Sequence, residues 1–156
     1  MPNFKLKAEP GRQDFTITYE FDAPPERVFK AMTDATMIPR WWGPRRYSTI
    51  VDKLEPKVGG QWRFINRAAD GGEHAFHGVF HLIDAPRRIV QTFEYEGAPG
   101  HVSLESLTLE ERGGRTVATA HSVFQSVEAR EGMMQGGMED GARETYERLE
   151  ELLAKK

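Results

Sequence analysis

The sequence has no cysteine among its 156 residues. Disulfide bonds, thiolate nucleophiles and cysteine-ligated metals are therefore excluded, which agrees with a reducing compartment. No apolar run approaches the roughly 18 residues that a membrane-spanning helix needs, so we expect no membrane insertion. The N-terminal segment also lacks the apolar core of a secretory signal, and we expect a cytoplasmic protein.

The chain also lacks an excess of positive charge. It has 21 basic and 24 acidic residues and a formal net charge of −3. A protein that binds nucleic acid through a broad surface needs the opposite balance, so we expect no nucleic-acid partner. The local basic group of Arg40, Arg45 and Arg46 is interpreted as a solvated rim.

Recognisable catalytic motifs are absent as well. The sequence contains no phosphate-binding loop, no Gly-x-Ser-x-Gly turn, no His-Glu-x-x-His pair and no dinucleotide fingerprint. We predict no cofactor and assign no catalytic residue. His74, His77 and His81 do not have metal-site geometry, because on a strand the last two lie ~13 Å apart and His74 points to the other face. We therefore predict no metal site.

The N-terminal half begins with alternating and then helical patterns. Residues 14–22 alternate apolar and polar side chains, which predicts a half-buried strand. Pro24 and Pro25 then open a short helix that buries one face, and a second short helix interrupted by Pro39 follows over 33–42. The first ten residues are interpreted as a frayed lead-in.

The middle of the chain predicts an antiparallel meander. Six segments of about ten residues have strand character, and Gly, Asp and Pro occupy the turns between them. The segments are 47–56, 59–68, 73–84, 87–96, 101–111 and 115–125.

The C-terminal segment, 126–156, predicts an amphipathic helix. Its apolar stripe recurs at steps of three or four residues from Met134 to Leu152. Four glycines lie in its first half, and each costs about 1 kcal/mol relative to alanine inside a helix. Either the helix is kinked or interrupted there, or another group approaches its backbone closely. The glycines are Gly132, Gly136, Gly137 and Gly141.

These elements together predict an α+β fold. A curved antiparallel sheet of about seven strands would grip the long C-terminal helix, with two short helices between the first two strands. The chain is long enough for one domain, which we place over 1–156 with its core at 14–153. The gap between the concave face and the helix would form a cavity, with the paired tryptophans at its mouth.

The order of elements and five motifs carry a family resemblance. The motifs are FDAPPERVFKAMTD, WWGP, KVGGQWRF, HGVFHLIDAPRRIVQTF and GGMEDGARETYERLEELL. The chain resembles the homologues of the activator of the heat-shock-protein-90 ATPase, in the START-like superfamily, which is also called SRPBCC, birch-pollen-allergen-like or helix-grip. The resemblance implies a helix-grip fold with a hydrophobic cavity for a small ligand. It implies less about activity, because a fold does not fix a function.

Ten residues are candidates for the cavity wall. Adjacent helical residues point about 100° apart, so we expect one tryptophan of the pair in the core and the other at the cavity. Ordinary core packing is an alternative explanation for the aromatic and methionine rows, and a structural role is an alternative for His121. The candidates are Trp41, Trp42, Trp62, Phe64, Phe76, Gly78, Phe80, His121, Met134 and Met138.

Charges inside the predicted strands are assigned by default to the outer face. This concerns Arg63, Glu94 and Glu105. If two of them pointed inward, they would form a polar anchor for a ligand head group.

Three functions are compatible with the sequence. The leading hypothesis is a protein that binds a small hydrophobic or aromatic molecule in the cavity. The second is a cavity enzyme of the polyketide cyclase or hydrolase type, with His121 and a strand carboxylate as acid–base groups. The third is a chaperone ATPase activator, which we rank last because the chain lacks the additional N-terminal domain of the longer co-chaperones. The oligomeric state is not determined by the sequence, and a homodimer is compatible with it.

Overall fold

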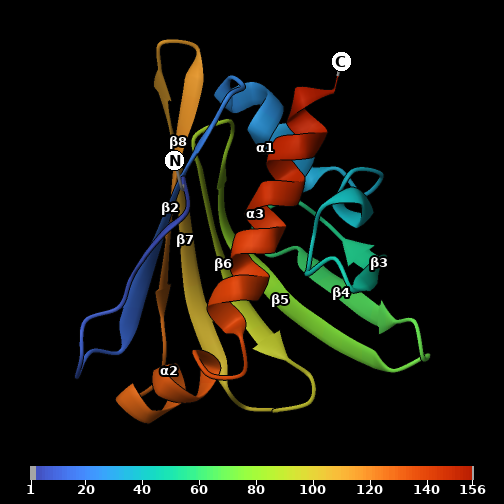
Figure 1. Cartoon of the computed structure of the whole chain (residues 1–156), viewed down its shortest axis with the longest axis vertical. Helices are drawn as coiled ribbons and strands as arrows, with labels where there is room; N and C mark the ends of the chain where they lie inside the picture. Colours follow the sequence, from blue (N-terminus) through green and yellow to red (C-terminus); the bar gives the residue numbers. More distant parts are fainter. Residues whose placement is uncertain (1–2, 156) are drawn as a thin grey trace.

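The computed structural model describes residues 3–155 and shows a curved sheet that wraps around one long helix (Figure 1). Within these residues the chain forms eight strands, three α-helices and one 3-10 helix. Their order is β1 (Lys5–Lys7), β2 (Asp14–Phe21), α1 (Pro25–Thr33), η1 (Ile38–Arg40), β3 (Tyr47–Leu54), β4 (Gln61–Ala68), β5 (Glu73–Asp84), β6 (Arg88–Tyr95), β7 (Val102–Arg112), β8 (Arg115–Val123), α2 (Val127–Met133) and α3 (Met138–Ala154).

The strands form one sheet in the order β1-β2-β8-β7-β6-β5-β4-β3, and each neighbouring pair is antiparallel. Register shifts interrupt β3 between Val51 and Lys53 and β5 between Phe80 and Leu82. Bulges of this kind bend a sheet, and they help it to curl toward α3. The predicted α+β architecture, with a sheet gripping a C-terminal helix, is confirmed.

The structure of the N-terminal segment differs from the prediction. Residues 3–10 are not a frayed lead-in, because Lys5–Lys7 forms a short edge strand on β2, with Leu6 opposite Ile17. Phe4 is buried beside it. Three residues are too few to show a period-two pattern, so the strand gave no sequence signal. The sheet therefore has eight strands among the described residues and not about seven; residues 1 and 2 lie outside the described part.

The two elements after β2 follow the predicted pattern. Pro25 occupies the first turn of α1, and Val28, Phe29 and Ala31 bury the face that packs on the core. The second element is shorter than expected, since only Ile38–Arg40 forms a 3-10 turn. It leads directly into Trp41 and Trp42.

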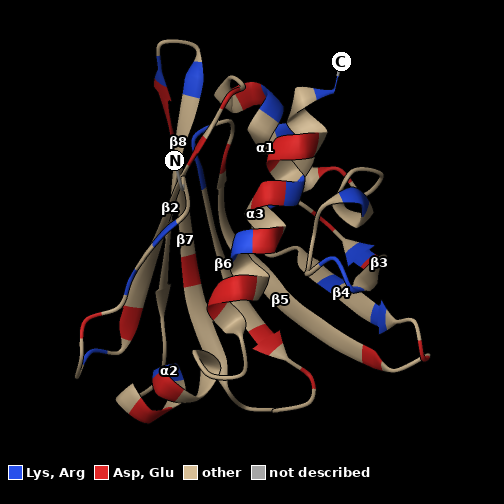
Figure 2. Ribbon diagram, in the orientation of Figure 1, with Lys and Arg blue, Asp and Glu red and all other residues tan. Residues whose placement is uncertain are grey.

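The C-terminal helix is interrupted, which is one of the two outcomes that the glycines predicted. Gly136 and Gly137 have φ values of 70° and 82°, in the left-handed region that favours glycine, and they separate α2 from α3. The remaining helix, α3, buries Leu149, Leu152 and Leu153 against the core. Figure 2 shows acidic and basic residues along α3, whereas the strand ribbons behind it carry few charges. No helix within residues 3–155 is long and apolar enough to cross a bilayer.

Candidate ligand pocket

A pocket of about 640 Å³ lies between the concave face of the sheet and α3. The alternation along the strands determines which side chains face it. Phe93 and Gln91 of β6 lie opposite Ser103 and Glu105 of β7, so these four share the inner face. Ala120 of β8 lies on the same face. The strands thus supply the floor of the pocket, and α3 with the loop after η1 supplies the roof.

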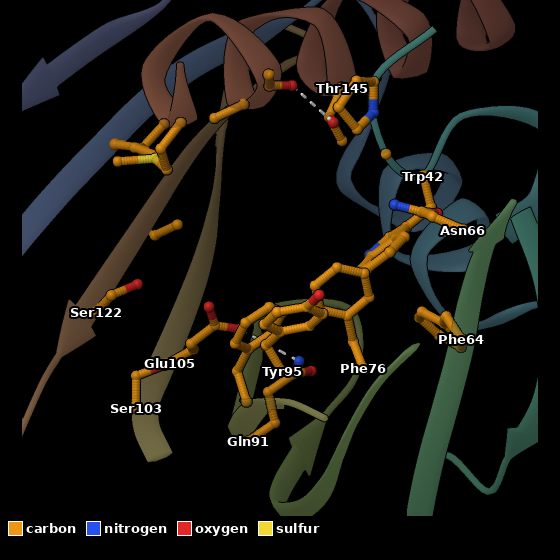
Figure 3. A pocket seen from close by; sticks show the side chains of 18 of the residues that line it. Trp42, Phe64, Asn66, Phe76, Gln91, Tyr95, Ser103, Glu105, Ser122 and Thr145 are labelled. Carbon is orange, nitrogen blue, oxygen red and sulfur yellow. Dashed lines mark hydrogen bonds between the residues drawn. The ribbon is translucent and has the colours of Figure 1, made fainter. Parts of the chain in front are cut away.

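Aromatic rings form one wall of the pocket (Figure 3). The Trp42 ring packs edge to face on Phe64 and Phe76, with centroids 5.1 and 5.3 Å apart. Phe76 in turn packs on Tyr95 at 5.2 Å, and Trp62 packs on Phe64 at 4.9 Å. Such a cluster is largely apolar, and its ring faces and edges border the pocket.

The two neighbouring tryptophans have different environments. Trp41 is 7% exposed, and its indole Nε1 donates a hydrogen bond to the Ala31 carbonyl at 2.9 Å. It fixes the segment after η1 to α1, although its edge also reaches the pocket. Trp42 instead lies on the aromatic wall. The backbone of Trp42 is held from both sides, because its carbonyl accepts a hydrogen bond from Thr49 at 2.6 Å and another from Arg148 at 3.4 Å.

Most of the predicted wall residues line the pocket. Besides the tryptophan pair they are Trp62, Phe64, Phe76, Phe80 and Met138.

Three predicted wall residues lie outside the lining as described for residues 3–155, and each has a physical reason. Gly78 faces inward, but a Cβ there would lie 1.9 Å from the Thr92 carbonyl oxygen and 2.5 Å from Trp62 Nε1. The missing side chain therefore permits close packing and leaves no space for a ligand. Met134 is the C-cap of α2, and because the helix ends there, Met133 lines the pocket in its place.

His121 is the third predicted wall residue that lies outside the lining as described for residues 3–155. It lies between the inward positions Ala120 and Ser122 on β8, so it points to the outer face of the sheet. There its Nε2 lies 2.8 Å from the Asp14 carboxylate. The prediction that His121 is a polar group of the cavity, and with it the acid–base role, is wrong. Asp14 also accepts a hydrogen bond from Arg12, and these contacts hold the pKa of Asp14 below its usual range.

Glu105 lies on the inner face of the sheet and not on the predicted outer face. It was assigned by default to the outer face, but it lies in the pocket wall (Figure 3). The Gln91 side-chain amide donates to Glu105 Oε1 at 3.4 Å. Burial raises the pKa of Glu105 to about 7, because a charged carboxylate is poorly solvated there. Ser103 and Ser122 lie on the same side of the pocket.

The other two strand charges do point outward. Arg63 pairs with Glu96 at 2.7 Å and with Asp52 at 3.3 Å on the outer face. Glu94 accepts a hydrogen bond from the Gly100 amide at 2.9 Å. The sequence did contain an indication that Glu105 faces inward, because it lies two and four residues before Leu107 and Leu109 and therefore on the same face of the strand. Leu104, which lies on the other face, is 44% exposed.

A second polar group lies among the aromatic rings. His74 Nδ1 lies 2.7 Å from the Tyr95 hydroxyl, and both residues line the pocket. Tyr47 packs edge to face on the His74 ring, and the Arg46 guanidinium lies over the Tyr47 ring at 5.0 Å. His77 lies on the opposite face beside Glu96, as strand alternation predicts. Among the described residues, no group of three or more acidic residues and histidines is arranged to hold a metal ion.

Comparison with known proteins gives one family and many related structures. The sequence profile described as activator of Hsp90 ATPase homolog 1-like protein matches residues 22–154. No curated protein matches the chain. A solution structure from Arthrobacter aurescens is 29% identical, with a TM-score of 0.89 over 97% of this chain and 92% of the other.

Two crystal structures extend the comparison. Protein Ms6760 from Mycobacterium smegmatis is 24% identical, with a TM-score of 0.87 over 97% of each chain. The AHSA1 protein from Silicibacter pomeroyi is 21% identical, with a TM-score of 0.73 over 90% of this chain and 97% of the other. At these identities the likeness shows a shared fold.

Proposed function

Because the chain belongs to the family of activator of Hsp90 ATPase homolog 1-like proteins, we propose that it binds a small, largely apolar or aromatic molecule in the pocket between the sheet and α3. The observation that carries this proposal is the pocket itself. Its volume of about 640 Å³ falls within the range of about 300–1,000 Å³ that is common for small-molecule sites.

The composition of the walls supports a guest with an aromatic or aliphatic body. Rings from β4, β5 and β6 and from the loop after η1 surround one side. Met133 and Met138 supply flexible thioether side chains near the interruption between α2 and α3. Methionine adapts to irregular apolar shapes, so this end of the pocket can accommodate guests of different outline.

The proposal is tested by filling the pocket from its floor. Ala120 lines the pocket on β8, and a phenylalanine at this position would occupy space that a ligand needs. Thr119 precedes it and points to the outer face, so Thr119→Phe is the matched control. Binding is measured by fluorescence titration with 1-anilinonaphthalene-8-sulfonate, followed by displacement with apolar compounds.

We expect Ala120→Phe to weaken dye binding by at least about tenfold, because the new phenylalanine side chain and the dye would compete for the same space. Thr119→Phe should bind like the wild type. Both variants are checked for a cooperative unfolding transition. A folded Ala120→Phe variant that binds the dye with wild-type affinity would contradict the proposed site.

A second candidate is catalysis inside the pocket, and Glu105 is the observation that favours it. A carboxyl group with a pKa of about 7 can accept or donate a proton near neutral pH. The two candidates differ in the fate of the ligand. If mass spectrometry recovers a bound compound unchanged after long incubation, binding is supported. A product that forms with the wild type and not with Glu105→Gln would support the enzyme.

A further inference from the structure

The pocket contains one unusual charged group. Of the residues in 3–155 that line it, Glu105 is the one with a carboxyl group. It extends from the middle of β7, and Figure 3 shows its side chain directed into the pocket near Gln91 and Tyr95. Acidic side chains are rarely enclosed by apolar surroundings unless they are paired.

The protein supplies little compensation for this carboxyl group. Gln91 donates to one of its oxygens, and the separation of 3.4 Å is long for a hydrogen bond. No Lys, Arg or His among residues 3–155 forms an ion pair with it at 4.0 Å or less. The two basic residues of the lining contact other groups, since Arg46 lies over Tyr47 and His74 binds the Tyr95 hydroxyl.

A carboxylate in such a place is stabilised most by a cation that also donates hydrogen bonds. The aromatic wall adds to this preference, because the faces of Trp and Tyr rings attract cations within about 6 Å of the ring centroid. A ligand with a carboxylate of its own would be repelled by Glu105. A ligand with a hydroxyl group could donate one hydrogen bond to the carboxylate, but it would lack the attraction between opposite charges that an ammonium group adds.

We propose that the pocket selects a primary amine on an apolar or aromatic body, with the ammonium group bound to Glu105 and Gln91 and the body packed against the rings around Trp42. This inference rests on the proposed ligand-binding function and specifies its ligand class. Glu105 provides the charge, and the Gln91 amide oxygen provides a further acceptor for an ammonium hydrogen.

The test uses three probes of nearly equal size that differ in charge. They are 2-(naphthalen-1-yl)ethylamine, 2-(naphthalen-1-yl)ethanol and naphthalene-1-acetate, each titrated into the wild type and Glu105→Gln by isothermal calorimetry at pH 8. For the wild type we expect the amine to bind about tenfold tighter than the alcohol, and the acetate to bind most weakly. In Glu105→Gln, the amine and the alcohol should bind within about twofold of one another.

The outcomes separate this inference from the function on which it rests. Binding of the alcohol with no preference for the amine overturns the inference and leaves the ligand-binding pocket in place. An amine preference that persists in Glu105→Gln also overturns it. If none of the probes binds the wild type, both proposals fail.

A second measurement needs no variant. An alkylamine remains protonated between pH 6 and pH 8, so the change in affinity follows the ionisation of the protein. Because burial raises the pKa of Glu105 to about 7, wild-type affinity for the amine should rise about tenfold over this range, and affinity for the alcohol should stay constant. Equal pH profiles for the two probes would contradict the inference.

Other groups are controlled in the same experiment. Glu105 faces Tyr146 from α3, the uncharged Gln91 from β6 and Ser122 from β8. The remaining ionisable groups of the lining are Arg46, Tyr47, His74 and Tyr95. Of these residue types, histidine is the one that can change its charge between pH 6 and pH 8. A pH profile that survives in Glu105→Gln and is lost in His74→Gln would assign the effect to His74 and overturn the role of Glu105.

Discussion

Replacing Glu105 by glutamine should make the protein more stable, and the gain should depend on pH. Burial raises the pKa of this carboxyl group from 4.5 to about 7. The folded state therefore binds the proton more tightly than the unfolded state does. The stability that this tighter binding provides is complete below about pH 4.5, falls as the pH rises and is lost above about pH 7.

The size of the effect follows from the two pKa values. The interval between 4.5 and about 7, at about 1.4 kcal/mol per pKa unit, corresponds to a cost of up to about 3 kcal/mol when Glu105 ionises in the folded protein. Water that enters the pocket reduces this cost by solvating the carboxylate. Glutamine has nearly the same shape, keeps a polar contact with Gln91 and carries no charge, so it removes the pH-dependent part.

The assay is urea unfolding of the wild type and Glu105→Gln at pH 5, 6, 7 and 8. We expect the difference in the free energy of unfolding to grow by about 2 kcal/mol from pH 5 to pH 8, in favour of the variant. The matched control is Glu110→Gln, an exposed position on the same strand, which should follow the wild type within about 0.5 kcal/mol. A difference between Glu105→Gln and the wild type that stays constant with pH would show that Glu105 does not ionise at a raised pKa in the folded protein.

Two further predictions concern packing and a buried charge. Gly78→Ala should lower the free energy of unfolding by about 3 kcal/mol, because the new methyl group would lie 1.9 Å from the Thr92 carbonyl oxygen. The control is Gly132→Ala, where the space is open, and this variant should be neutral or slightly stabilised. Equal urea midpoints for the two variants would contradict this prediction. Arg130→Met should lower the free energy of unfolding by about 3 kcal/mol, because Arg130 is only 2% exposed and donates to the backbone carbonyls of Glu9 and Asp14 at 2.8 and 2.9 Å. The control is the surface variant Arg87→Met, which should cost less than about 0.5 kcal/mol. Similar losses for the two variants in thermal unfolding would contradict a structural role for Arg130.

Much of the fold could be predicted because the sheet has one buried face and short turns. Alternation along residues 14–22 and the glycine-rich turns placed most strands within two residues of their observed ends. The break between α2 and α3 could also be predicted from the local sequence, because Gly136 and Gly137 adopt φ values that other residues rarely adopt. The strand Lys5–Lys7 was missed, because its existence depends on pairing with β2 and not on its own three residues.

The site was harder to predict, because facing depends on register. His121 and Glu105 each lie one residue from a position on the opposite face, and an error of one residue reverses the assignment. On β7 the outward assignment of Glu105 rests on the default that acidic side chains are exposed, and not on the pattern of the strand. On the C-terminal segment, the glycines predicted an interruption as one of two outcomes but not its exact position, and because α2 ends at Met133, Met133 lines the pocket instead of Met134.

The most direct test of a ligand-binding pocket is NMR of the methionine methyl groups, labelled with carbon-13, during titration with 2-(naphthalen-1-yl)ethanol. This neutral probe does not depend on the role of Glu105. Met32, Met133 and Met138 line the pocket, whereas Met37 and Met134 lie outside its lining as described for residues 3–155. We expect saturable shifts for the methyl signals of Met32, Met133 and Met138 and small shifts for those of Met37 and Met134. Shifts confined to Met37 and Met134, or no shifts at saturating probe, would contradict this expectation.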